Sequence, residues 1–185
     1  MPTIGQISTN PNNGDSYEFL ETANDTSGQR VTLKATILSK GQYVPNHFHA
    51  FQDETFEVIS GQLTILIDGN PKILSAGEKI TLQKNIPHNH YNNSDMPLIY
   101  IQTVTPALDF DYLVENLVGL AADGKSKNGK YGLMQELVAL KYLDSKSYLA
   151  DIPVGIQKVL MHTVAPIGRL LGYRAIYKKY SGIEK

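Results

Sequence analysis

The chain has no cysteine among its 185 residues. Disulfide bonds, thiolate nucleophiles and zinc sites with sulfur ligands are therefore excluded. Histidine and the carboxylates are the strong metal ligands that remain. The sequence also lacks any run of about 18 or more consecutive apolar residues, so no segment predicts a membrane-spanning helix.

The chain also lacks an excess of charge of either sign. The chain has 17 basic and 18 acidic side chains and a formal net charge of -1, so no overall field favours nucleic acid or a membrane. The first residues, Met1 to Ser8, have neither a basic start nor an apolar run, which argues against a signal peptide. We therefore expect a cytoplasmic protein that binds no nucleic acid. Its length fits one domain, or one domain with an appendage.

The first 106 residues have the pattern of short β-strands. Alternation is clearest over residues 30–39, where one face carries Val31, Leu33, Ala35 and Ile37. Asp68-Gly69 is a signal for a tight turn. Further strands are predicted over residues 16–21, 55–60, 62–68, 72–74, 78–82, 88–92 and 97–105. Short strands with turn signals about every 8–12 residues are typical of an all-β sandwich or barrel.

The pattern becomes helical after Pro106. One face of a first helix, which Asp109 can cap, carries Phe110, Leu113, Leu117 and Leu120. Residues 121–130 predict a polar loop, and a second helix is predicted over about residues 133–142. A third helix should begin at Ile152-Pro153 and end or kink near Ala165, because Pro166 follows.

Two segments of the predicted β region together supply three histidines that can meet at one point. His47 and His49 are two residues apart, so their side chains project from the same face of a strand. Glu54 can return to the same point across a hairpin around Gly61, and His88 begins a later strand. Three imidazoles and one carboxylate suit one divalent transition metal ion, namely iron, manganese, nickel, copper or zinc.

Three other polar residues are weighed against this set. His90 has the parity of His88, so it either points inward or lies at the rim. Glu57 has the opposite parity to Glu54, and we expect it to face away from the metal. His162 lies in the predicted third helix and is expected to be structural or exposed.

The spacing resembles that of the cupin superfamily, small β-barrels with two short motifs. The first motif is matched throughout by Gly41, His47, His49, Glu54 and Gly61. The second is matched by Gly77, His88 and Asn92, with Gln83 and Asn85 in place of its proline and second glycine. Asparagine tolerates left-handed backbone, so we expect the turn to be kept. Residues 106–110 and 170–174 are also similar to segments of small single-domain bacterial cupins.

This resemblance implies a mostly β fold, a single cupin jelly-roll β-barrel followed by a C-terminal α-helical extension. We expect residues 1–106 to form the barrel and residues 107–185 to form the extension, packed on the barrel. The resemblance implies that the metal ligands are His47, His49, Glu54 and His88. It also implies a small-molecule ligand and a homodimer, since such barrels often pair.

Two functions follow from the resemblance. The first is a metal-dependent, dioxygenase-like enzyme that acts on a small organic molecule, in a pocket shaped by Phe48, Phe56 and Tyr100. The sequence identifies no catalytic acid–base pair. The alternative is a non-catalytic barrel that binds or senses a small ligand. Fold resemblance alone does not choose between them, because similar barrels support many activities.

The C-terminal segment differs in charge from the rest of the chain. Residues 154–185 hold six basic and one acidic side chain, a net charge of +5. Such a basic, amphipathic segment can lie on a membrane surface. It can equally leave its lysines in water and pack its apolar side chains on the barrel or a partner subunit, namely Ile156, Val159, Leu160, Leu170 and Leu171. The packed arrangement is the one we expect.

Overall fold

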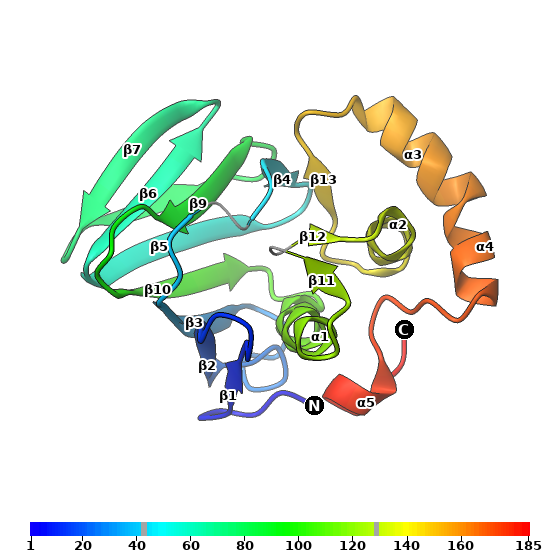
Figure 1. The fold of residues 1–185 in the computed structure, drawn as a ribbon, viewed down its shortest axis with the longest axis horizontal. Helices are drawn as coiled ribbons and strands as arrows, with labels where there is room; N and C mark the ends of the chain where they lie inside the picture. Colours follow the sequence, from blue (N-terminus) through cyan, green and yellow to red (C-terminus); the bar gives the residue numbers. More distant parts are fainter. Residues whose placement is uncertain (42–43, 128–129) are drawn as a thin grey trace.

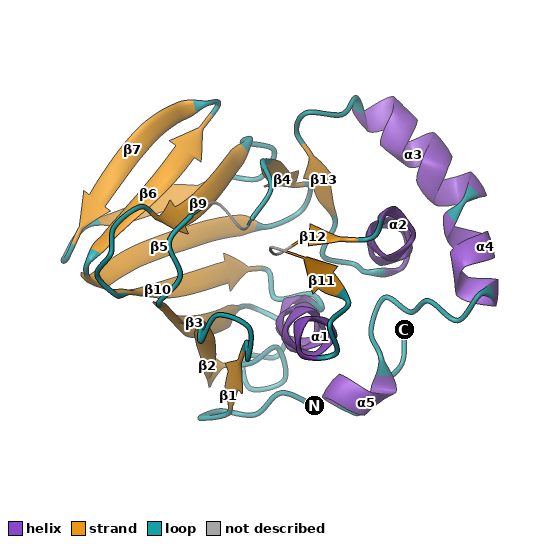
Figure 2. Cartoon of the chain, in the orientation of Figure 1, coloured by secondary structure: helices purple, strands orange, loops and turns teal. Residues whose placement is uncertain are grey.

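The computed structural model describes residues 1–41, 44–127 and 130–185, and its first part consists of strands (Figures 1 and 2). The strands are β1 (Ile7–Thr9), β2 (Ser16–Glu21), β3 (Val31–Ile37), β4 (His47–His49), β5 (Asp53–Ser60), β6 (Gln62–Ile67), β7 (Asn70–Ser75), β8 (Lys79–Leu82), β9 (His88–Asn92) and β10 (Leu98–Thr105). The predicted strands are confirmed, with bounds shifted by one or two residues. β1 was not predicted.

The helices and three short strands follow in the second part of the chain. They are α1 (Phe110–Ala122), β11 (Ser126–Lys127), β12 (Lys130–Tyr131), α2 (Leu133–Tyr142), β13 (Ser147–Leu149), α3 (Val154–Thr163), α4 (Ala165–Leu170) and α5 (Lys178–Ser181). The three predicted helices are confirmed, and the third breaks at Val164, next to Pro166. The predicted mostly β fold with C-terminal helices is therefore confirmed.

The strands form two antiparallel sheets that pack face to face. The six-stranded sheet has the order β1-β2-β3-β10-β5-β8, and the five-stranded sheet has the order β13-β4-β9-β6-β7. Alternation in β3 places Val31, Leu33 and Ala35 in the interior with no exposed surface. Apolar side chains from both sheets meet in this interior, among them Phe56 and Leu63. Burial of these faces supplies the main driving force for closing the barrel.

The hairpin predicted around Gly61 is wrong. β5 and β6 flank this glycine, yet they belong to different sheets, so the chain crosses between the sheets here. Gly61 has a φ of 82°, and a Cβ at this position would lie 2.6 Å from the carbonyl oxygen of Pro97. Only glycine fits such a crossing without strain. The consequence is that Glu54, in β5, lies in the sheet opposite the histidines of β4.

The predicted polar loop at residues 121–130 is also partly wrong. Its first two residues complete α1, and Ser126–Lys127 pairs with Lys130–Tyr131 in a two-stranded hairpin. Residues 128–129 of the predicted loop lie outside the described residues. Short polar strands of this kind have no apolar alternation, so the sequence pattern does not distinguish them from a loop.

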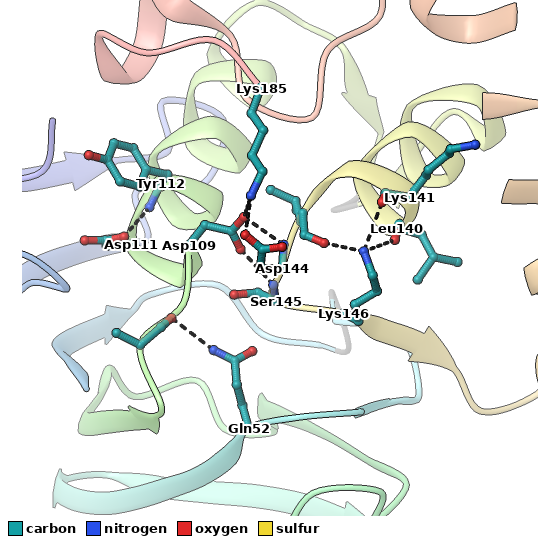
Figure 3. Close-up of polar contacts among 12 residues, drawn as sticks. Gln52, Asp109, Asp111, Tyr112, Leu140, Lys141, Asp144, Ser145, Lys146 and Lys185 are labelled. Carbon is teal, nitrogen blue, oxygen red and sulfur yellow. Dashed lines mark hydrogen bonds and ion pairs between the residues drawn. The ribbon is translucent and has the colours of Figure 1, made fainter. Parts of the chain in front are cut away.

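Asp109 does not cap α1, contrary to the prediction. No side-chain hydrogen bond closes the helix start, because the carboxylate accepts from the backbone N–H groups of Asp144 and Ser145, each at 2.8 Å. Lys185 Nζ bridges Asp109, at 2.8 Å, and Asp144, at 2.5 Å (Figure 3). These contacts tie the start of α1 to the segment that leads into β13.

Gln52 and Lys146 lie near Asp109, below it and to its right in Figure 3, and bind backbone carbonyls of neighbouring segments. The buried amide of Gln52 donates to the carbonyl oxygens of Pro106 and Ala107, at 2.9 and 3.1 Å, just before α1. Lys146 Nζ donates to the carbonyl oxygens of Leu140 and Lys141, each at 3.0 Å, at the end of α2. A cation there satisfies helix carbonyls that have no partner within the helix.

The extension packs partly on the barrel and partly on itself. Phe110 and Val114 of α1 pack on the barrel core beside Phe19 and Leu33. α3 and α4 instead pack on α2 (Figure 1). Of the apolar residues of this segment that we expect to be covered, Leu160 is half-buried. The others are exposed within this chain, namely Ile156, Val159, Leu170 and Leu171. Among the described residues, no helix has the length and apolar character that a bilayer crossing needs.

Candidate metal centre

Four side chains from both sheets converge in the barrel. His47 and His49 come from β4 and His88 from β9, all in the five-stranded sheet, whereas Glu54 comes from β5 in the opposite sheet. One ligand atom from each residue lies within 4.8 Å of all the others. None of the four residues is more than 9% exposed. The structure thus brings together the four side chains that the sequence singled out.

Each imidazole is oriented by a hydrogen bond at its outer nitrogen. Nδ1 of His47 lies 2.9 Å from the carbonyl oxygen of Pro45, and Nδ1 of His88 lies 2.8 Å from that of Ile86. A carbonyl oxygen only accepts, so Nδ1 carries the proton in both rings. Nε2 of both rings therefore points into the cluster. Such partners fix the tautomer that metal-binding histidines need.

The inner distances fit one cation at the centre. Nε2 of His47 lies 3.3 Å from Nε2 of His49, and Nε2 of His88 lies 2.8 Å from Oε2 of Glu54. With Nδ1 of His47 and His88 protonated, a proton or a metal ion must lie between the two atoms of each contact, and a proton on Nε2 of His88 makes its contact with Glu54 a hydrogen bond. Nitrogens about 2.1 Å from one ion lie roughly 3.0–3.4 Å apart at octahedral or tetrahedral angles. The donor set thus fits a transition metal.

Glu54 is held by groups from three strands. Its Oε1 accepts a hydrogen bond from Nε2 of Gln102 in β10. Its Oε2 lies 3.3 Å from Nε2 of His49 in addition to the contact with His88. Burial alone would raise the pKa of Glu54, but the nearby charge of His49 and hydrogen bonds from both histidines hold it well below its usual value. The carboxylate is therefore charged at neutral pH.

Protonation of the histidines follows their surroundings. Burial, reinforced by His49 and His88, lowers the pKa of His47 to about 3, so this imidazole is neutral at physiological pH. Burial also lowers the pKa of His88, but the hydrogen bond and charge of Glu54 outweigh it and raise the pKa overall. Neutral His47 and charged Glu54 are in the forms that ligate metal, whereas a protonated His88 would release a proton on metal binding.

A residue that sequence reasoning missed lies behind His49. Ser147 Oγ is 3.0 Å from Nδ1 of His49. Ser147 begins β13, which pairs antiparallel with β4 and places Ser147 opposite His49, Tyr148 opposite Phe48 and Leu149 opposite His47. No motif spacing indicates this contact, because it depends on a long-range strand pairing. The extension therefore supplies the edge strand that pairs with β4, the strand that carries two of the histidines.

The remaining candidates have different positions. His90 faces the interior, with its ring 4.6 Å from that of Phe56 and 5.9 Å from that of Tyr100, and it is not part of the four-residue cluster. Burial lowers its pKa to about 4. A cavity of about 40 Å³ lies beside His90 and Tyr100. By volume this cavity holds a few water molecules at most.

Phe48 does not line the interior, so the prediction for this residue is wrong. It projects from the opposite face of β4 to the histidines and stacks on Tyr148, with ring centroids 5.6 Å apart. Glu57 faces away from the cluster, as predicted, and its Oε2 lies 3.3 Å from Lys79 Nζ. His162 is exposed, which agrees with the prediction.

The fold and the cluster together define a β-barrel with a buried centre of three histidines and one glutamate. Residues 35–104 match the family model that describes the cupin domain. The matched range includes all four clustered side chains, so the chain carries a cupin domain and the predicted cupin barrel is confirmed. No curated protein sequence matches the chain.

Several solved structures are similar to part of the chain. A cupin-superfamily sugar phosphate isomerase from Silicibacter pomeroyi is 19% identical, with 49% of this chain and 59% of that chain covered and a TM-score of 0.44. KdgF from a Halomonas species is 14% identical, with 52% and 82% covered and a TM-score of 0.45. The nucleoside dehydratase Pac13 is 15% identical, with 51% and 71% covered and a TM-score of 0.41. These partial similarities assign no activity to this chain.

Proposed function

We propose that the chain is a metal-dependent cupin that binds one divalent transition metal ion and acts on a small organic molecule. The ligands are Nε2 of His47, His49 and His88 and the carboxylate of Glu54. One observation carries this proposal. Nε2 of His88 lies 2.8 Å from Oε2 of Glu54, while Nδ1 of His88 donates a hydrogen bond to the carbonyl oxygen of Ile86. A proton on Nε2 of His88 or a metal ion can join these two atoms, and a metal ion would displace the proton on binding.

The protein's own part is to hold the ligands and to exclude water. When bound, iron, manganese, nickel, copper or zinc polarises an oxygen ligand, and the redox-active ions among them also react with dioxygen. The groups nearest to the ligands are Ser147, Gln102 and Phe110, whose ring centroid lies 6.3 Å from that of His49. None of these three titrates near neutral pH, which favours chemistry supplied by the ion over acid–base catalysis.

The concrete form of the enzyme proposal is a dioxygenase-like reaction on an aromatic or enolic molecule. Phe56, Tyr100 and the neutral His90 surround the interior beside the cluster. Aromatic side chains would suit an apolar small molecule, although the cavity of about 40 Å³ beside them would have to widen to admit one. The resemblance to cupins supports this class without selecting a substrate.

A second function is favoured by the burial of the ligands. Side chains with at most 9% exposure leave little access for a large substrate. This supports the alternative that the barrel is a non-catalytic module in which the metal holds a small ligand or stabilises the fold. In that case the helical extension, which touches the centre through Ser147, would transmit ligand binding to a partner.

Oxygen consumption distinguishes the two functions. The protein is loaded separately with each of the five metals and mixed with a panel of flavonols and enols in an oxygen electrode. Metal-dependent uptake that disappears in His49→Ala supports the enzyme. Stoichiometric zinc, together with no uptake for any metal, supports the binding module. Binding of no metal in any preparation rejects both.

Assembly, location and domain division are further parts of the proposal. We propose a homodimer and a cytoplasmic location, as the cupin resemblance implies. We also propose that residues 1–106 and 107–185 are barrel and extension, which unfold together because β13 pairs with β4. Sedimentation equilibrium measures the assembly, and a single unfolding transition for both parts is the expected result.

A further inference from the structure

The outer face of α3 and α4 is an exposed apolar stripe. Its large members are Ile156 (52% exposed), Val159 (62%), Ile167 (54%), Leu170 (88%) and Leu171 (68%). Together with Thr163, the first four are spaced by three or four residues, which places them along one side of a helix. Scattered single apolar residues are normal on a surface, but a continuous stripe marks an interaction site.

The stripe lies on α3 and α4, which together form a helical rod that packs on α2. Helical hydrogen bonds continue across the break, from Val164 N–H to the Leu160 carbonyl at 2.8 Å and from Gly168 N–H to the Val164 carbonyl at 3.0 Å. The other side of the rod packs on α2, where Gly168 is so close that a Cβ would lie 2.6 Å from Met134 Sδ. Figure 1 shows α3 and α4 along the outer edge of the molecule, beyond α2. The fold therefore fixes the stripe facing outward.

The segment that carries the stripe has charges of one sign only. Residues 152–183 contain no aspartate or glutamate. Lys158, His162 and Arg169 follow at helical spacing beside the stripe and are all exposed. The Arg169 guanidinium lies 4.5 Å from the ring centroid of Tyr142 on α2, which holds it at this flank. An apolar face with a cationic flank and no anion is complementary to an anionic surface that has an apolar layer beneath it.

We propose that the α3–α4 stripe binds the surface of a bilayer that contains anionic lipids. The apolar side chains would enter the boundary between headgroups and acyl chains, while Lys158 and Arg169 would contact the headgroup phosphates. The rod would lie in the plane of the interface, because the other side of it is packed on α2. This inference does not depend on the metal centre or on the proposed reaction.

A second copy of the chain fits this surface less well than lipid. Two copies packed through the stripe would bring two cationic flanks together, and residues 152–183 contain no carboxylate to offset them. A bilayer with anionic headgroups offsets the charge and covers the apolar side chains at once. Self-association through the stripe is therefore treated as an outcome that contradicts the proposal.

Flotation with lipid vesicles tests the proposal. The full chain is mixed with vesicles of phosphatidylcholine alone or of phosphatidylcholine and phosphatidylglycerol in equal parts, at low and high salt. We expect binding to the anionic vesicles, and weaker binding at high salt because the charges are screened. Equal binding to both vesicles would contradict the role of Lys158 and Arg169. No binding to either would overturn the proposal.

Matched substitutions locate the contact. Ile167→Ser combined with Leu170→Ser should lower the vesicle partition coefficient at least about tenfold, and Lys158→Glu should lower it about tenfold. The controls are Ile73→Ser and Lys72→Glu, exposed residues of β7 in the barrel, which should have no effect. Circular dichroism verifies folding, and all five positions are on the surface.

The reverse patterns contradict the proposal. Binding that survives the stripe variants, or is lost in the β7 controls, would place the contact elsewhere. Sedimentation velocity without lipid covers the remaining case: a dimer that dissociates in Ile167→Ser with Leu170→Ser, together with no vesicle binding, would assign the stripe to self-association.

Discussion

The hydroxyl of Ser147 lies 3.0 Å from Nδ1 of His49, although the two residues are 98 positions apart in the chain. The contact links the helical extension to the centre of the barrel, because Ser147 belongs to β13 and His49 to β4. His47 and His88 use nearby backbone carbonyls for the same purpose. His49 alone among the three histidines depends on a distant side chain for its orientation.

Ser147→Ala should therefore weaken metal binding without unfolding the protein. Loss of a partner behind a metal-binding histidine lowers metal affinity about 10–100-fold. Ser147→Thr keeps the hydroxyl and should restore most of the affinity. Competition with a chromogenic chelator measures both variants. Equal affinity of Ser147→Ala and the unchanged chain would show that the contact does not orient His49.

Gln102→Leu should also weaken metal binding, because it removes a hydrogen bond to the carboxylate of Glu54. Gln102 donates to Oε1 of Glu54 from the adjacent strand, and leucine has a similar size but no donor. We expect metal affinity to fall about tenfold and the other carboxylate contacts to remain. Gln62→Leu, at an exposed position of β6, is the matched control. Isothermal titration with one metal measures the difference, and identical curves for all three proteins would contradict the role of Gln102.

Asp109→Ala should destabilise the fold. The carboxylate accepts from two backbone N–H groups and from Lys185 and is only 7% exposed. Leaving buried donors without a partner costs about 1–3 kcal/mol each, so we expect a loss of roughly 3 kcal/mol in unfolding free energy. Asp95→Ala is the control, because its exposed ion pair with Lys40 should contribute less than about 1 kcal/mol. Urea denaturation measures both, and similar values for the two variants would contradict this account.

Asp109 should also make the unfolding free energy depend on pH, with lower stability in acid. Burial would raise the pKa of Asp109, but hydrogen bonds from Lys185, Asp144 and Ser145 outweigh it and lower the pKa below its usual value. The stabilisation is therefore fully present above the unfolded pKa of about 3.9 and is lost as the pH falls through the lower folded pKa. Unfolding free energies measured from neutral to acidic pH should fall less steeply in Asp109→Asn. Parallel curves would show that Asp109 does not contribute.

Local spacing predicted which four side chains cluster, because strand parity is a local property. His47 and His49 share a face in any strand, and the interval to Glu54 is part of a recurrent motif. The same reasoning failed for Gly61, whose hairpin depends on which strands pair rather than on which residues alternate. Phe48 was placed in the interior although parity with His47 and His49 puts it on the opposite face, where Tyr148 covers it.

Long-range contacts account for what the sequence did not predict in the extension. β13 has three residues, too few for an alternating pattern, and its pairing with β4 is visible only in three dimensions. Asp109 has a suitable position for a helix cap, but the N–H groups of Asp144 and Ser145 bind its carboxylate instead. Amphipathic spacing in α3 identified a helix correctly and left open which side is covered, since both sides carry apolar residues.

The most direct test of the proposed centre is the metal content of the purified chain after reconstitution, measured by inductively coupled plasma mass spectrometry beside His49→Ala and the exposed control His162→Ala. The account predicts one transition metal ion per chain for the unchanged protein and for His162→Ala, and a large loss in His49→Ala with folding intact. Absence of metal in the unchanged protein, or equal occupancy in all three, would contradict the assignment of His47, His49, Glu54 and His88 as a metal site.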